Sequence, residues 1–211
     1  MKRAFDIAFS TILLVLLSPV LLIASLVIYL QDFHSPFYFG ERVGKDGRLF
    51  KMIKLRSMTV NADRNKVDST SAADPRITTA GHFVRRYKLD ELMQLWNVLR
   101  GDMSIVGPRP EVKKFVDLYT EEERVILSVR PGITDWSSIK FHNEPEIIAA
   151  SGIPDADTAY AKLIRPEKLR LQLKYVREHC FLLDLFIIVS TLLTLVSTRF
   201  GGNPVGVPEQ F

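Results

Sequence analysis

Two adjacent carboxylates, Asp90 and Glu91, stand in the segment of the chain that is densest in residues able to do chemistry. The cations that flank them in the sequence are Arg85, Arg86, Lys88 and Arg109. A carboxylate pair surrounded by cations can hold a divalent metal ion and a diphosphate group. Acids in the first turn of a helix also have a plainer explanation, since they complement the partial positive charge of its N-terminus. The flanking cations weigh against that explanation and favour a phosphate site.

Apolar residues at helical spacing are expected to position this pair. Leucines recur one helical turn apart from Leu89 to Leu99, and Gly101 ends the pattern. This spacing predicts a helix over residues 89–100, with both carboxylates in its first turn.

A basic segment, FYFGERVGKDGRLFKMIKLRSM, begins at Phe37. Its KDG sequence lies between two alternations of apolar and polar residues, which predicts a β-hairpin. The turn is followed by Lys51, Lys54 and Arg56. They form either a solvated face near lipid headgroups or a cradle for phosphate groups. The polar segment at 61–75 is expected to be a mobile loop over the site.

The chain carries an uncharged apolar stretch at residues 9–30, long enough for a membrane helix. Ser18 and Pro19 lie near its centre, where proline removes a backbone donor and the serine hydroxyl can replace it. The stretch either spans the bilayer as a kinked helix or breaks there and leaves by the face it entered. Basic residues lie on both sides of it, and only the second path keeps both groups in the cytoplasm.

The C-terminal part contains a basic stretch at 169–179, which predicts a helix, and an apolar stretch at 181–196. The apolar stretch is short and interrupted by Asp184, which favours a helix lying in the headgroup plane over a second span. Residues 201–211 are expected to form a loose tail.

Composition limits the classes of function. The chain has 211 residues, a formal net charge of +4 and a mean hydropathy of +0.09. A basic excess attracts anionic partners such as phosphorylated substrates or lipid headgroups. The single cysteine, Cys180, excludes an internal disulfide, and together with four histidines it offers no zinc-ligand spacing. A metal ion here should be a hard one bound by oxygen atoms.

Motifs along almost the whole chain, from Lys2 to about Val196, resemble the monotopic phosphoglycosyl transferases of the bacterial sugar transferase family, which are polyprenyl-phosphate sugar-1-phosphate transferases. The motifs are KRAFDI, the basic segment described above, DPRIT, Gly81 with Arg85, LDEL, QLWNVLRGDMS, VGPRP and RPGIT. Together they are highly specific, although no single one is.

The resemblance implies a small, helix-rich α/β cytosolic domain with an N-terminal re-entrant membrane helix broken at Ser18 and Pro19, and interfacial amphipathic helices. The expected boundaries are 1–34 for the membrane helix, 35–180 for the catalytic domain, 181–199 for an interfacial helix and 200–211 for the tail. The implied location is the bacterial inner (cytoplasmic) membrane, with the catalytic domain on the cytoplasmic face.

The implied reaction transfers a sugar-1-phosphate from a nucleoside-diphosphate sugar, with UDP expected, to polyprenyl (undecaprenyl) phosphate. This is the first membrane step of glycoconjugate assembly. By the same resemblance, Asp90 is the nucleophile and binds the Mg²⁺ cofactor, with Glu91 as its partner. Arg85 and Arg109 match family positions and are expected to bind phosphate. The further phosphate-binding candidates are Lys54, Arg56, Arg76 and Arg86.

Two departures from the family pattern bear on the site. Met93 stands where the family commonly has proline, which predicts only a local packing change. Asp135, Trp136 and the segment up to Asp157 follow PGIT with an unusual sequence and are expected to shape the sugar or nucleotide pocket.

The competing function is a non-catalytic, membrane-anchored basic scaffold that binds anionic lipid or nucleic acid. Charge attraction alone does not require the close LDEL and PRP motifs, which favours the enzyme. Nucleic acid is not an expected partner, because no run of basic residues interleaved with aromatic residues is present. Formation of a homodimer through the amphipathic elements stays open.

Overall fold

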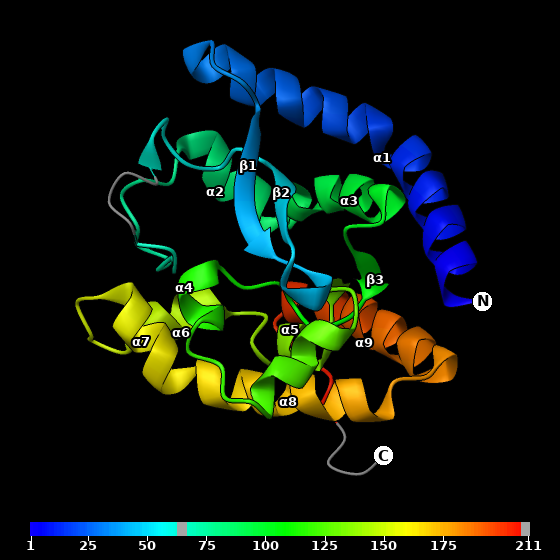
Figure 1. The fold of residues 1–211 in the computed structure, drawn as a ribbon. Coiled ribbons are helices and arrows are strands. Elements are labelled where there is room, and N and C mark those ends of the chain that lie inside the picture. Colours follow the sequence, from blue (N-terminus) through cyan, green and yellow to red (C-terminus); the bar gives the residue numbers. More distant parts are fainter. Residues whose placement is uncertain (63–66, 208–211) are drawn as a thin grey trace.

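A long helix, α1 (Lys2–Asp32), begins the chain and runs along one edge of the molecule in the computed structural model (Figure 1). The structure describes residues 1–62 and 67–207, so part of the loop predicted at 61–75 and the end of the predicted tail lie outside the described residues. The helix-rich α/β fold is confirmed, with two small sheets among many helices.

Helix α1 continues through Pro19 and bends near its middle (Figure 1). The proline cannot donate to the carbonyl of Val15, four residues back. The Ser18 hydroxyl donates to that carbonyl instead, at 2.8 Å. The predicted substitution of the serine hydroxyl for the missing backbone donor is therefore confirmed, and the expected break takes the form of a bend within one helix.

Both ends of α1 are attached to the same body of the protein. Near its start, Lys2 Nζ donates to Asp184 Oδ2 at 2.6 Å, and the buried Asp6 accepts from Ser104 Oγ at 2.8 Å. At its end, Asp32 receives two hydrogen bonds from Arg56, at 2.5 and 2.6 Å. Between these attachments lies an apolar stretch of mean hydropathy 2.8, of which only 11% is buried.

The predicted hairpin is confirmed as strands β1 (Phe37–Val43) and β2 (Leu49–Leu55), which pair antiparallel. A tight turn, η1 (Lys45–Gly47), joins them, and Gly47 has a φ of 74°, a conformation that glycine adopts without strain. In this register Tyr38 lies opposite Lys54, so both side chains lie on one face of the hairpin.

Three short helices follow, and they position the carboxylates. They are α2 (Thr79–Arg86), the 3₁₀-helix η3 (Leu89–Met93) and α3 (Gln94–Arg100). The predicted helix thus begins with a tighter 3₁₀ turn and ends at Gly101, whose φ is 90°. Buried Asn97 fixes α3 against β2, because its side chain accepts from the Ile53 nitrogen at 2.9 Å and donates to the Lys51 carbonyl at 2.8 Å.

Strands β3 (Ser104–Val106) and β4 (Gly132–Thr134) form a parallel pair that brings the VGPRP and RPGIT motifs together. The two segments approach each other closely at their glycines. A Cβ atom on Gly132 would lie 2.1 Å from the Gly107 nitrogen, and one on Gly107 would lie 2.5 Å from the Arg130 oxygen. The glycines of both motifs are therefore required by packing.

The remaining helices complete the fold. They are α4 (Lys113–Val116), η4 (Glu123–Ser128), α5 (Trp136–Lys140), α6 (Glu144–Ala150), α7 (Ala156–Leu163), α8 (Arg165–Glu178) and α9 (Phe181–Arg199). Helices α8 and α9 confirm the two helices predicted near the C-terminus.

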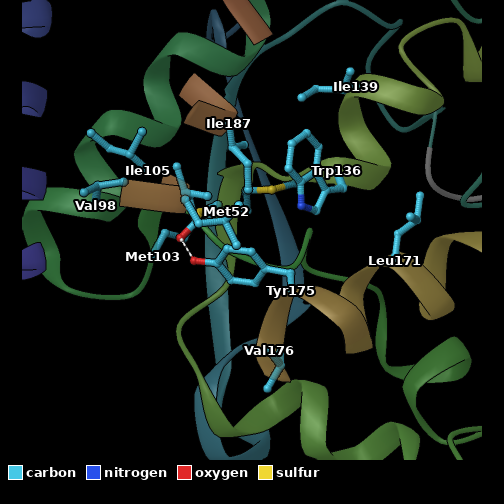
Figure 2. Close-up of a cluster of buried hydrophobic side chains, with 12 residues drawn as sticks. Met52, Val98, Met103, Ile105, Trp136, Ile139, Leu171, Tyr175, Val176 and Ile187 are labelled. Atoms are coloured by element: carbon cyan, nitrogen blue, oxygen red, sulfur yellow. Dashed lines mark hydrogen bonds between the residues drawn. The ribbon is translucent and has the colours of Figure 1, made fainter. Parts of the chain in front are cut away.

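The main core lies between β2, α3, β3, α5, α8 and α9 (Figure 2). Trp136 and Tyr175 are among its largest fully buried side chains, and the Tyr175 hydroxyl oxygen lies 3.2 Å from the Val106 carbonyl oxygen. Helix α9 contributes Leu183 and Ile187 to this core, whereas residues such as Leu182 and Leu193 are exposed. One face of this apolar helix is thus packed and the other is open.

Candidate functional site

Asp90 lies in the first turn of η3 and is 7% exposed. Its Oδ1 atom has no hydrogen-bond partner in the part of the chain that the structure describes. Burial and the neighbouring Glu91 charge raise the pKa of Asp90, while the charges of Lys54, Arg85 and Lys88 oppose the rise. Asp90 is therefore a buried carboxylate with an uncommitted oxygen, surrounded by cations.

Glu91, the next residue, has the opposite environment. Arg109 donates to both of its carboxylate oxygens, with Nη1 at 3.1 Å from Oε2, and Lys54 Nζ lies 3.3 Å from Oε1. Burial alone would raise the pKa of Glu91, but the charges of Arg109 and Lys54 bring it well below its ordinary value. Two adjacent carboxyl groups thus have pKa values shifted in opposite directions, an arrangement typical of sites in which the two groups have different tasks.

The backbone enters this site through Lys88, which adopts the left-handed α conformation. Lys88 has a φ of 55° and directly precedes η3, and its Nζ donates to the His142 carbonyl at 3.3 Å. Its charge lowers the pKa of both carboxyl groups.

Arg85 reaches the site from α2 through a close contact with the end of the basic segment. Gly81 permits this contact, because a Cβ atom there would lie 1.9 Å from the Ser57 carbonyl oxygen. One turn later, Arg85 Nε donates to Ser57 Oγ at 2.8 Å. Burial lowers the pKa of Arg85, and the Asp90 charge opposes that effect. The Gly81 and Arg85 motif is therefore one packing unit that aims the arginine at Asp90.

Arg109 is held at both its backbone and its side chain. Its backbone nitrogen donates to Asp135 Oδ2 at 3.3 Å, its Nη1 donates to the Ile133 carbonyl at 3.2 Å, and Gln172 Nε2 donates to its carbonyl at 3.3 Å. Asp135 is fully buried and Trp136 is 2% exposed in the core. These two side chains support Arg109 and the core, and their role in shaping the sugar or nucleotide pocket stays a prediction.

The remaining candidates lie elsewhere. Arg56 binds Asp32 and the Ser35 carbonyl at the end of α1. Arg76 binds Asp74 at 2.7 Å and the Ala62 carbonyl at 3.0 Å, within its own loop. Arg86 is exposed at the end of α2. The structure therefore brings Lys54, Arg85 and Arg109 to the carboxylates and gives Arg56 and Arg76 other partners.

Two further side chains, one on β1 and one in α3, were not identified from the sequence as part of the site region. Arg42 lies on β1, where its electrostatic neighbours include Arg109 and Lys54. Gln94 is fully buried one turn after Asp90, and its amide has no hydrogen-bond partner among the described residues. Strand alternation from Tyr38 could have indicated Arg42, because residues two apart share a face.

A cavity of about 300 Å³ lies beside the loop that holds Arg76. Its lining residues are Val67, Ser71, Ala73, Asp74, Pro75, Arg76, Pro154, Asp155 and Ala156. The segment at 154–156, part of the stretch that was predicted to shape the sugar or nucleotide pocket, contributes to this cavity.

The family model described as bacterial sugar transferase matches residues 1–198. The exopolysaccharide production protein ExoY of Sinorhizobium fredii is 33% identical over 213 residues, covering 94% of this chain and 86% of that protein.

Two further relatives have names that describe lipid-linked sugar transfer. A UDP-glucose:undecaprenyl-phosphate glucose-1-phosphate transferase of Escherichia coli K12 is 35% identical over 195 residues, covering 91% of this chain and 39% of that protein. A UDP-N-acetylgalactosamine-undecaprenyl-phosphate N-acetylgalactosaminephosphotransferase of Aeromonas hydrophila is 32% identical over 205 residues, covering 96% of this chain and 45% of that protein.

The chain thus spans less than half of the E. coli and A. hydrophila relatives and most of ExoY. The family match runs through α1, the basic hairpin, the carboxylate pair and the two glycine motifs that support Arg109. All the elements that build the candidate site lie inside the matched region, and the chain belongs to the bacterial sugar transferase family.

Proposed function

We propose that this protein is a phosphoglycosyl transferase that moves a sugar-1-phosphate from a nucleoside-diphosphate sugar, with UDP expected, to undecaprenyl phosphate or a similar polyprenyl phosphate. The observation that carries the proposal is the adjacent pair Asp90 and Glu91, one with an uncommitted oxygen and the other neutralised by Arg109 and Lys54. The names of the E. coli and A. hydrophila relatives support the same chemistry.

In the first proposed step, a carboxylate oxygen of Asp90 attacks the phosphorus that carries the sugar. A bond forms between that oxygen and phosphorus while the bond from phosphorus to the bridging oxygen breaks. The bridging oxygen leaves with the electron pair as part of the nucleoside monophosphate. The product on the enzyme is an acyl phosphosugar, and Arg85 and Lys88 stabilise the charge on its phosphate oxygens.

In the second step, a phosphate oxygen of the polyprenyl phosphate attacks the same phosphorus. The bond from phosphorus to Asp90 breaks, so the carboxylate is regenerated and the polyprenyl-diphosphate sugar is released. The two substrates need not occupy the site together, which suits a water-soluble donor and an acceptor whose phosphate lies at the membrane surface. Glu91 keeps Arg109 and Lys54 in place through both steps.

Mg²⁺ fits the groups at this site. The described residues contain no cluster of three or more His, Cys, Asp or Glu that would form an all-protein metal site. Mg²⁺ commonly binds through one or two carboxylates together with substrate phosphates and water, and Asp90 has an unpartnered carboxylate oxygen. We assign Asp90 as the protein ligand; the ion, when bound, neutralises charge on the diphosphate.

Membrane attachment through a re-entrant α1 is part of the proposal. The apolar middle of α1 is exposed while both of its ends bind the same body through Lys2, Asp6 and Asp32. A straight span would place one end about 30 Å away across the hydrocarbon core. The open apolar face of α9 supports a second contact with the membrane surface.

The test is release of nucleoside monophosphate from a panel of nucleotide sugars, with polyprenyl phosphate and Mg²⁺. We expect release from at least one donor, and a phosphosugar adduct by intact mass when the acceptor is omitted. Asp90→Asn should abolish both, with a fall in kcat of at least about 10³-fold. Asp46→Asn, at an exposed turn position, is the matched control and should keep both signals. Substantial turnover by Asp90→Asn would remove Asp90 from the nucleophile role.

A further inference from the structure

Arg42 lies on the same face of the hairpin as Lys54, the residue that contacts Glu91. Tyr38, Gly40 and Arg42 alternate along β1 and therefore share a face, and Tyr38 lies opposite Lys54 on β2. Lys54 Nζ reaches Glu91 from that face, at 3.3 Å. The strand register thus directs Arg42 toward the same side of the hairpin as a residue of the candidate site.

Gly40 allows the Tyr38 and Arg42 side chains to fold over the strand between them. A Cβ atom built on Gly40 would lie 2.9 Å from Tyr38 Cε1 and 3.2 Å from Arg42 Nη1. The ring and the guanidinium group therefore both occupy the space above the glycine. This packing limits the positions that the Arg42 guanidinium can take.

Arg42 is half-buried, but no carboxylate of the described residues forms an ion pair with it. Its one hydrogen bond within the same described part is from Nη1 to the Glu41 carbonyl, at 2.7 Å. By contrast, Arg56, Arg76 and Arg109 each bind a carboxylate. Burial lowers the pKa of Arg42, and the charges of Asp68 and Glu111 oppose that effect without forming an ion pair with it.

The charges around Arg42 indicate which part of a substrate it would meet. Arg109 is among its main electrostatic neighbours, and Arg42 in turn acts on Lys54. The charges of Asp68 and Glu111 also act on Arg42. Lys54 and Arg109 both bind Glu91. Arg42 therefore belongs with Lys54 and Arg109, the cations that bind Glu91 rather than Asp90.

We propose that Arg42, held over Gly40 by Tyr38, binds the phosphate of the donor that leaves with the nucleoside. The inference rests on the proposed function, since it divides the donor diphosphate between two groups of cations. Arg85 and Lys88 surround the phosphorus that Asp90 attacks, and Arg42 binds the phosphate on the nucleoside side. An anion there supplies the direct ion pair that the half-buried guanidinium lacks among the described residues.

The test uses the full-length protein with a donor that it turns over, and measures the donor KM and the inhibition constant of the nucleoside monophosphate product. Arg42→Ala should raise both by about 10- to 100-fold, the loss expected for hydrogen bonds to a charged group. Arg42→Lys should recover part of this loss. Gly40→Ala, which keeps the charge but displaces both side chains, should raise both constants by a smaller factor.

Arg48→Ala is the matched control, because it removes an exposed arginine at the turn of the same hairpin. It should leave both constants unchanged. If Arg42→Ala fails to fold by thermal unfolding, Arg42→Lys and Gly40→Ala decide the question. Unchanged donor KM and product inhibition in all folded variants, with an intact Asp90 adduct, would overturn the assignment of Arg42 alone. Wild-type protein that releases no nucleoside monophosphate from any donor would reject the proposed function, and this inference with it.

Discussion

Arg109 donates to both carboxylate oxygens of Glu91, so the residue next to the proposed nucleophile is already committed to an ion pair. The pair joins the helix η3 to the loop between β3 and α4, across 18 residues of sequence. The same bidentate contact neutralises the charge beside Asp90 and fixes the arginine in the site. Glu91 is thus expected to act through the position of Arg109.

A double-mutant cycle tests whether Glu91 and Arg109 act as one unit. Arg109→Ala should lower kcat/KM by about 10²-fold, because it removes a phosphate ligand and leaves the Glu91 charge without its main partner. Glu91→Gln should lower it by a similar factor. The double variant should lose less than tenfold more than either single variant, since partners in one network are not additive. Fully additive losses, with well-folded proteins, would contradict the coupling.

Arg56 is predicted to hold α1 rather than phosphate. Arg56→Ala should lower the free energy of unfolding by about 1–3 kcal/mol, because it removes two hydrogen bonds to the Asp32 carboxylate. The donor KM should stay close to wild type. Asp32→Asn is the partner variant and should have a smaller effect in the same direction. A large rise in donor KM with unchanged stability would instead assign Arg56 to the substrate.

Gly81→Ala is predicted to destabilise the protein and to weaken the donor site together. Its Cβ would lie 1.9 Å from the Ser57 backbone oxygen, so α2 must move away from the end of the hairpin. We expect a loss of about 1–3 kcal/mol in the free energy of unfolding, from overpacking. The hydrogen bond from Arg85 to Ser57 should be lost as well. Gly206→Ala, where nothing lies near the added atom, should be neutral in the same thermal and kinetic measurements.

Tyr175 is predicted to make the fold sensitive to alkaline pH. Burial and the adjacent Asp184 carboxylate raise the pKa of its phenol above the ordinary value. Its contribution is complete below about pH 10, where the unfolded phenol is also neutral. As pH rises further, the unfolded phenol ionises while the folded one stays neutral, so stability falls.

The measurement is the melting temperature across that alkaline range. Tyr175→Phe should be less stable at neutral pH, because the hydroxyl donates to Asp184 at 2.7 Å, but its stability should fall less steeply as pH rises. Tyr87→Phe, at an exposed position, is the control and should follow the wild-type slope. Parallel slopes for Tyr175→Phe and wild type would contradict this prediction.

Both ends of α1 are predicted to lie on the cytoplasmic side of the membrane. Cys180 is the only cysteine, so a Cys180→Ser background permits single-site labelling. Ala4→Cys and His34→Cys, both at exposed positions, report the two ends of the helix. In intact cells a membrane-impermeant maleimide should label neither, and after lysis it should label both. Labelling of one end alone in intact cells would mean that α1 spans the bilayer.

The sequence predicted the parts of this protein that depend on local patterns. The KDG turn between two alternating segments predicted the hairpin of β1 and β2, and the leucine spacing that ends at Gly101 predicted the helix after the carboxylates. Ser18 and Pro19 predicted a local disturbance in α1, and the structure shows the replacement hydrogen bond. These features succeed because neighbouring residues alone decide them.

Assigning the arginines required tertiary contacts. All of them carry the same charge in the sequence, and only the fold decides which has a carboxylate partner. Arg56 pairs with Asp32 and Arg76 with Asp74, whereas Arg85 and Arg109 reach the carboxylates from different elements. The place of Trp136 also required the fold, since an unusual residue in a motif can as easily fill the core as line a pocket.

By itself, the sequence determined the family, the apolar helix at the N-terminus and the position of Asp90 and Glu91 in one helical turn. Only the tertiary structure separated the roles of these two acids. The difference between their roles has two causes. Arg109 lies beside Glu91 because the glycine contact between β3 and β4 positions its loop, and burial leaves one Asp90 oxygen without a partner among the described residues. The pKa and the partners of a carboxyl group depend on its distances to charged groups, and those distances are set by the fold and not contained in the linear sequence.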